Sequence, residues 1–118
     1  MVKVMIPVTD ESGKEISQHF GRAPYWAWYL VEGGKISENG AIPNDSDHFG
    51  GVGSPPEKIA AHGGNIVISA GMGTKAISLF QEAKVAVLKA QSLDTLENVH
   101  KYIAGSLIEE TEGCLHEH

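Results

Sequence analysis

The chain has 118 residues, one cysteine and a formal net charge of −6, from 15 acidic and 9 basic residues, which is the size of one domain with a single core. No apolar stretch approaches the roughly 20 residues of a membrane-spanning helix, and a lone cysteine excludes an internal disulfide and suits a reducing compartment. The basic residues are scattered singly, so the chain lacks the cationic face that nucleic-acid binding requires.

Three strands are predicted before any helix. Residues 2–8 alternate strongly and weakly apolar side chains and carry no signal-peptide features, so they predict a strand and a cytoplasmic protein. The aromatic run 25–31 predicts the second strand. Gly33-Gly34 then gives a strong hairpin signal before a third strand over 35–42, which makes the three an antiparallel meander.

Helices and strands alternate in the rest of the chain. Ser54 and Glu57 have the spacing of a capping box, at the start of a helix that ends at Gly63-Gly64. The apolar runs 66–68 and 85–88 predict buried strands of the kind that helices cover on both faces.

Two further helices are predicted from their apolar stripes. One follows Gly73, and the other is capped by Asp94 with Glu97 and ends at Gly105. The expected inward faces are Ala76, Ile77, Phe80 and Ala83 in the first helix and Leu96, Val99 and Ile103 in the second.

The element order βββαβαβα predicts an α/β domain in three layers, α/β/α. A mixed five-stranded sheet lies between helices, and right-handed crossovers join its parallel strands. We place this domain at residues 1–108 and expect residues 109–118 to be a flexible Cys/His tail. The long connections at 9–24 and 43–54, together with 69–74 and 89–93, should gather at the carboxyl edge of the sheet, where open α/β sheets bind ligands.

The tripeptide His-Phe-Gly occurs twice, at His19 in the first long connection and at His48 in the second. Neutral imidazole is the commonest side-chain ligand of iron, zinc and copper, so His19 and His48 together could hold an exposed metal centre. The alternative is that each histidine supports a turn or bonds a nearby carbonyl while its phenylalanine packs inward.

A glycine-rich turn separates the strand at 66–68 from the next helix. Gly71 and Gly73 would let a ligand approach the backbone, and the helix N-terminus that follows offers N–H groups to an anion. Arg22 and Lys75 flank the same edge and would neutralise an anion in this acidic protein. The alternative is that the turn needs glycine for steric reasons alone and that both cations are simply solvated.

The C-terminal residues place a thiol and two imidazoles close together, at Cys114, His116 and His118. Such a tract can bind a metal and act as a mobile handover arm, although a closed site usually requires four ligands. The other interpretation is an unstructured end with incidental histidines. A tail of about a dozen residues spans roughly 40 Å when extended, so it can reach the carboxyl edge.

The pattern does not favour an enzyme. A ribonuclease-like active site needs several carboxylates that converge on two metal ions, whereas strand one is followed only by Asp10 and Glu11. No Ser-His-Asp or Cys-His set falls at the predicted edge, because Cys114 lies in the tail. We therefore expect a binding protein.

Four segments carry a family resemblance. They are Ile6-Pro7-Val8, the run Ser17-Gln18-His19-Phe20-Gly21-Arg22-Ala23-Pro24, the Gly-rich stretch 48–53, and Gly71-Met72-Gly73-Thr74-Lys75-Ala76. Up to about residue 108 the chain resembles the dinitrogenase iron-molybdenum cofactor biosynthesis family, which includes cofactor carriers and nitrogenase accessory proteins. The resemblance implies a ribonuclease H-like fold with three α/β/α layers.

The resemblance also implies a function. It implies that the chain binds and delivers an iron-sulfur or iron-molybdenum cluster, with His19 as the ligand and the cluster's donor and acceptor proteins as partners. One or two imidazoles with a cationic rim would hold such a cluster reversibly. The alternative is a non-metal regulatory or scaffold domain that binds a small anion or a partner protein at the same edge, through Gly73 and Lys75.

Overall fold

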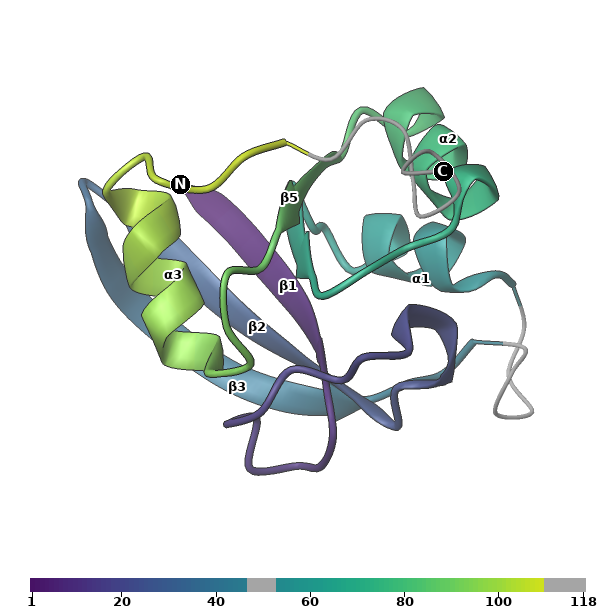
Figure 1. Cartoon of the computed structure of the whole chain (residues 1–118), viewed down its shortest axis with the longest axis horizontal. Helices are drawn as coiled ribbons and strands as arrows, with labels where there is room; N and C mark the ends of the chain where they lie inside the picture. The colour runs from purple at the N-terminus through teal and green to yellow at the C-terminus, as the bar shows by residue number, and fades with distance from the viewer. Residues whose placement is uncertain (47–52, 110–118) are drawn as a thin grey trace.

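The computed structural model describes residues 1–46 and 53–109, and Figure 1 shows how their strands and helices follow one another. The strands are β1 (Val2–Val8), β2 (Tyr25–Glu32), β3 (Lys35–Pro43), β4 (Ile66–Ser69) and β5 (Ala86–Lys89). The helices are α1 (Pro55–Ala61), α2 (Thr74–Glu82) and α3 (Thr95–Ile103), and a 3-10 turn, η1, spans Phe20–Arg22. The predicted order of strands and helices is confirmed.

The five strands form a mixed sheet in the order β3-β2-β1-β4-β5. β1 pairs antiparallel with β2, and β2 pairs antiparallel with β3, whereas β4 is parallel to both β1 and β5. β1, β3, β4 and β5 therefore point the same way. Their carboxyl ends lie at one edge, as the sequence predicts, and the connections that leave them begin there.

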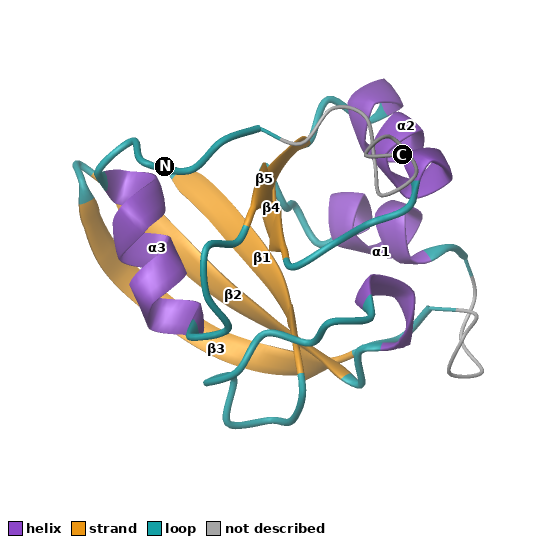
Figure 2. Ribbon diagram, viewed as in Figure 1, coloured by secondary structure: helices purple, strands orange, loops and turns teal. Residues whose placement is uncertain are grey.

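Helices cover both faces of the sheet. Successive side chains of a strand point to opposite faces, and apolar side chains on each face pack against a helix. One face packs Met5, Trp26, Val67 and Val87 against Ile59 of α1 and Ile77 and Phe80 of α2. The other face packs Val4, Ile6, Val8 and Ile68 against Val99 of α3. Figure 2 shows α3 apart from the neighbouring α1 and α2, which gives the predicted three layers. The ribonuclease H-like classification stays a prediction.

The helix caps form where the sequence predicts them. In α1 the Ser54 N–H donates to Glu57 Oε1 at 2.9 Å, and the Glu57 N–H donates to Ser54 Oγ at 3.3 Å. In α3 the Asp94 carboxylate accepts from the Glu97 N–H at 2.8 Å. Gly105 follows α3 with a φ of 76°, the left-handed conformation that ends many helices.

Two residues predicted to face inward lie outside. Leu96 is 48% exposed because α3 begins at Thr95 and turns Thr95 and Val99 inward, and Leu96 lies about 100° of rotation away from Thr95. Ala83 is exposed because α2 has already ended before it, and the chain turns away through Lys84 with a φ of 63°.

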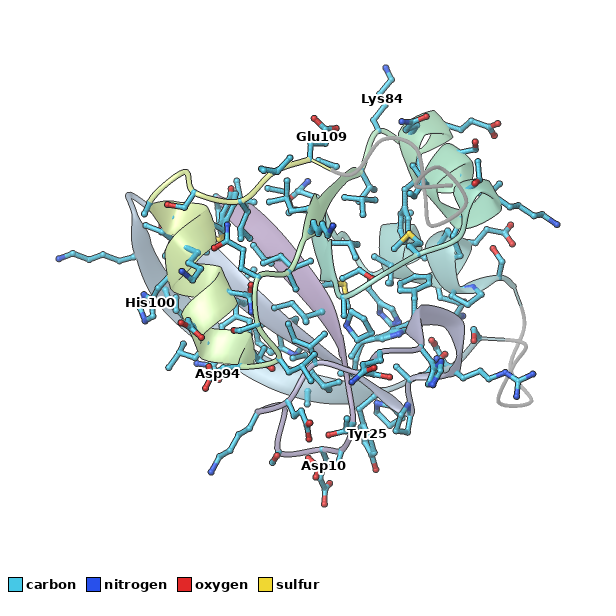
Figure 3. All side chains as sticks on the ribbon, viewed as in Figure 1. Asp10, Tyr25, Lys84, Asp94, His100 and Glu109 are labelled. Carbon is cyan, nitrogen blue, oxygen red and sulfur yellow. The ribbon has the colours of Figure 1, made fainter. Side chains whose placement is uncertain are left out.

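Beyond α3 the chain returns beside β5. The Lys89 N–H donates to the Ile108 carbonyl at 2.9 Å, and Glu109 pairs antiparallel with Leu88. At Glu109 the chain therefore runs away from the carboxyl edge, and Figure 3 shows Glu109 on the opposite side of the molecule from Asp10. In the part of the chain that the structure describes, no helix is both long and apolar enough to span a bilayer.

A candidate ligand cleft at the carboxyl edge

A cleft of about 520 Å³ opens at the carboxyl edge of the sheet. Three segments line it: Gln18, Phe20 and Gly21 from the 9–24 connection, Ser54, Pro55 and Pro56 at the start of α1, and Gly71, Met72, Gly73, Lys75, Ala76 and Leu79 from the β4–α2 turn and α2. Most of these walls are apolar. Among the described lining residues, Lys75 is the only charged one, so the cleft favours a small anion over a cation.

The turn at residues 17–23 forms one wall of the cleft. Ser17 Oγ accepts a hydrogen bond from the His19 N–H at 3.2 Å and donates to the His19 carbonyl at 3.3 Å, which holds the backbone at the start of η1. Phe20 is buried and packs edge-to-face on Phe80, with the ring centroids 5.5 Å apart. His19 is exposed and stands between the cleft-lining residues Gln18 and Phe20, a position that we call the rim.

The β4–α2 turn forms the facing wall, and here too a serine hydroxyl bonds both backbone groups of the residue two positions later. Ser69 Oγ accepts from the Gly71 N–H at 3.1 Å and donates to the Gly71 carbonyl at 2.9 Å. Gly73 is the N-cap of α2 and provides no side-chain cap. Met72, between the two glycines, is 3% exposed, so the turn is anchored while both glycines line the cleft.

The structure brings together three of the predicted site residues, Gly71, Gly73 and Lys75, as cleft-lining residues. His19 and Arg22 are exposed on the adjoining turn and do not line the cleft themselves. The remaining predicted ligands, His48, Cys114, His116 and His118, lie outside the described residues.

An ionic cluster ties the chain after β3 to α1, beside the cleft. Asp45 Oδ2 lies 3.3 Å from Lys58 Nζ and 3.4 Å from His62 Nε2. Burial raises the pKa of the Asp45 carboxyl, but the hydrogen bonds from Lys58 and His62 together outweigh it and hold that pKa below its usual value. Asp45 and Lys58 therefore neutralise each other, and neither is a cleft-lining charge.

On the two turns that form the cleft walls, residues 17–23 and 69–75, His19 is the one His, Cys, Asp or Glu side chain. Within residues 1–46 and 53–109, no three His, Cys, Asp or Glu side chains gather in one place. The His19 ring makes no hydrogen bond to a described residue. The arrangement therefore suits one exposed, exchangeable ligand to a cluster and does not suit a closed four-ligand site.

Gln18 and Met72 are cleft residues that were not singled out from the sequence. Gln18 also lines a neighbouring hollow of about 400 Å³, so it stands between two depressions at the same edge. In the sequence, only their positions beside predicted site residues indicate them: Gln18 precedes His19, and Met72 lies between Gly71 and Gly73.

The fold and the cleft define a class, the three-layer α/β domains with a mixed five-stranded sheet and a cleft at its carboxyl edge. Within this class, the family model described as dinitrogenase iron-molybdenum cofactor matches residues 2–105. The chain belongs to this family, as its sequence motifs indicated.

Several other proteins are similar to this chain over nearly its whole length. An uncharacterized protein of Methanocaldococcus jannaschii is 28% identical over 109 residues, which are 91% of this chain and 90% of the relative. The solved structure of a candidate dinitrogenase from the same species has a TM-score of 0.74 at 20% identity and covers 93% of this chain and 95% of that one. The apo form of the orange protein from Desulfovibrio gigas has a TM-score of 0.80 at 15% identity, with 97% of each chain covered. At these identities the two structures support the fold alone.

Proposed function

We propose that this protein is an accessory of metallocluster assembly, which binds an iron-sulfur or iron-molybdenum cluster and passes it to an acceptor protein. The observation that carries the proposal is the exposed His19 imidazole at the rim of a cleft built partly from its own neighbours Gln18, Phe20 and Gly21. Membership in the iron-molybdenum cofactor family supports the same cargo.

The chemistry of the edge suits a carrier. One imidazole exchanges its metal more readily than a closed set of ligands, so His19 would hold the cluster without trapping it. The apolar walls and the Lys75 ammonium would contact a weakly hydrated, anionic cluster on its remaining faces. Arg22, exposed on the same turn, adds a second cation nearby.

We propose carriage and not catalysis. The nuclease-like alternative would rely on Asp10, and this carboxylate accepts hydrogen bonds from the Ser12 Oγ at 2.6 Å and the Ser12 N–H at 2.9 Å. These bonds lower the pKa of Asp10 and hold its carboxylate in a local turn. Figure 3 shows Asp10 at the outer end of its connection, pointing into solvent.

A second candidate function rests on a different observation. Gly73 and Lys75 line the cleft directly, whereas His19 stands beside it. A regulatory or scaffold domain that binds a small phosphate-bearing ligand would use the helix N-terminus and the Lys75 ammonium. That function would not require the imidazole.

Anaerobic reconstitution with iron, sulfide and molybdate separates these functions. After desalting, the iron, sulfide and molybdenum contents are measured for the wild type, His19→Ala, His100→Ala and a chain truncated after Gly113. His100 is an exposed histidine on α3 and serves as the matched control. We expect His19→Ala to retain at most about a tenth of the wild-type iron, as for loss of a metal-site residue, and His100→Ala to retain all of it.

Two other outcomes of the reconstitution would contradict the proposed role of His19. Loss of iron only on truncation would move the metal site to the C-terminal tail and refute the role of His19. If the wild type retains no metal but binds phosphate, and Lys75→Ala abolishes that binding while His19→Ala does not, the second candidate is correct.

A further inference from the structure

Asn44 is a buried amide at the point where the chain leaves β3. It is 4% exposed, and its Nδ2 donates to the Ala23 carbonyl at 2.8 Å, with a second, longer contact to the Gly21 carbonyl at 3.4 Å. Its backbone N–H donates to the Pro24 carbonyl at 2.9 Å. Its Oδ1 accepts from the Ser46 N–H at 2.9 Å. One side chain therefore joins two connections at the carboxyl edge.

These contacts lie on the far end of the turn that forms the cleft wall. Ser17 holds the start of η1 through both backbone groups of His19, and Asn44 holds its end through Ala23. Between the two anchors stand the exposed imidazole and the cleft-lining residues Phe20 and Gly21.

We infer that Asn44 is a positioning residue for the cargo site, and that its amide donors fix the turn at residues 19–23 relative to the β4–α2 wall. This inference rests on the proposed function. Without the donors, a buried carbonyl at Ala23 loses its partner, and the turn must shift to satisfy it. The imidazole and the cleft wall would then no longer meet the same cluster.

Asn98 provides the matched control. It is fully buried, its Oδ1 accepts from the Gln91 N–H at 2.9 Å, and its Nδ2 donates to the carbonyls of Ser92 at 2.9 Å and Asp94 at 2.8 Å. It thus braces another connection at the same edge by the same chemistry. None of the residues that it contacts lines the cleft.

The test compares Asn44→Asp with Asn98→Asp. Each change keeps the acceptor oxygen and replaces the amide donors with a carboxylate oxygen that faces carbonyls. Melting temperature is measured first, and the rate of iron loss from reconstituted protein is then measured well below both transitions. Hydrogen exchange of the Arg22 and Ala23 amides is measured in the cluster-free protein, because these amides close η1 through their bonds to His19 and Phe20.

We expect both variants to melt at lower temperature. Asn44→Asp should lose iron about tenfold faster than the wild type, with a rise of about tenfold in exchange at Arg22 and Ala23. Asn98→Asp should stay within about twofold of the wild type in both measurements. Unchanged exchange at these two amides in Asn44→Asp, or equally fast iron loss in Asn98→Asp, would overturn the inference.

The exchange measurement needs no cluster and so separates the two claims. If the wild type retains no iron, the proposed function fails. A rise in exchange confined to Arg22 and Ala23 would still support Asn44 as the residue that positions this edge, and its absence would overturn that role.

Discussion

Gly40 lies opposite Trp28 in the β2–β3 pair, where the indole ring covers the backbone. A Cβ placed on Gly40 would stand 2.9 Å from three ring atoms, closer than side chains pack without a shift. The ring is partly buried and packs against the core on the α1 and α2 face of the sheet, which limits how far it can shift.

We therefore predict that Gly40→Ala lowers the free energy of unfolding by about 1–3 kcal/mol, the usual cost of overpacking. Urea denaturation measures this free energy. Gly73→Ala is the control, since a Cβ there meets nothing within 4 Å, and its effect should stay below about 1 kcal/mol. Equal losses in the two variants would show that Trp28 does not restrict position 40.

At the residue scale, the sequence shows which side chains could bind a ligand better than it shows which residues each side chain contacts. His19, Gly71 and Lys75 could be chosen from their types and their position after a strand, and all three lie at the cleft or its rim. Asn44 could not be chosen, because a buried asparagine and a turn-forming one look alike until its partners 21 and 23 residues away are known.

The ion cluster of Asp45, Lys58 and His62 joins the chain after β3 to α1. Because the pKa of Asp45 is depressed in the folded protein, the cluster stabilises the fold above the unfolded pKa of about 4. That stability is lost as the pH falls through the folded pKa, which lies lower still. The carboxylate is 43% exposed, so solvent screening limits the contribution to roughly 0.2–1 kcal/mol.

We predict that Asp45→Asn is less stable than the wild type by this amount near pH 6, and that the difference shrinks as the pH falls below the unfolded pKa and vanishes below the folded one. Thermal or urea unfolding at a series of pH values measures it. Glu11→Gln, at an exposed position in the 9–24 connection, should show no such trend. A difference between Asp45→Asn and the wild type that persisted at low pH would mean that Asp45 stabilises the fold by some route other than its charge.

At the element scale, local signals predicted most of the secondary structure. These signals are the capping serine, the Gly33-Gly34 hairpin and the strand alternation. Each depends on residues close together in the chain, so each can be recognised from the sequence alone. Leu96 shows the limit of such signals. The helix face that turns inward depends on how α3 packs on β1. This packing buries Val99, as predicted, but it buries Thr95 in place of Leu96. Turn η1 was missed because its anchor, Asn44, lies far along the chain.

At the scale of the whole molecule, the topology determines which connections meet. Parallel β1, β4 and β5 bring the 9–24 connection and the β4–α2 turn to one edge, and this was predictable from the order of elements. The cleft itself was not predictable, because its walls come from three segments whose separation depends on packing between α1, α2 and the sheet.

The proposed carrier function depends on ligation of the cluster by His19. Pulsed EPR of the reduced, cluster-loaded protein, prepared with isotopically labelled histidine, tests it most directly through the hyperfine coupling of a ligand nitrogen. If His19 is the ligand, a histidine nitrogen coupling appears in the wild type and in His100→Ala and is absent from His19→Ala. A coupling that survives His19→Ala, or a loaded wild type without one, would contradict it.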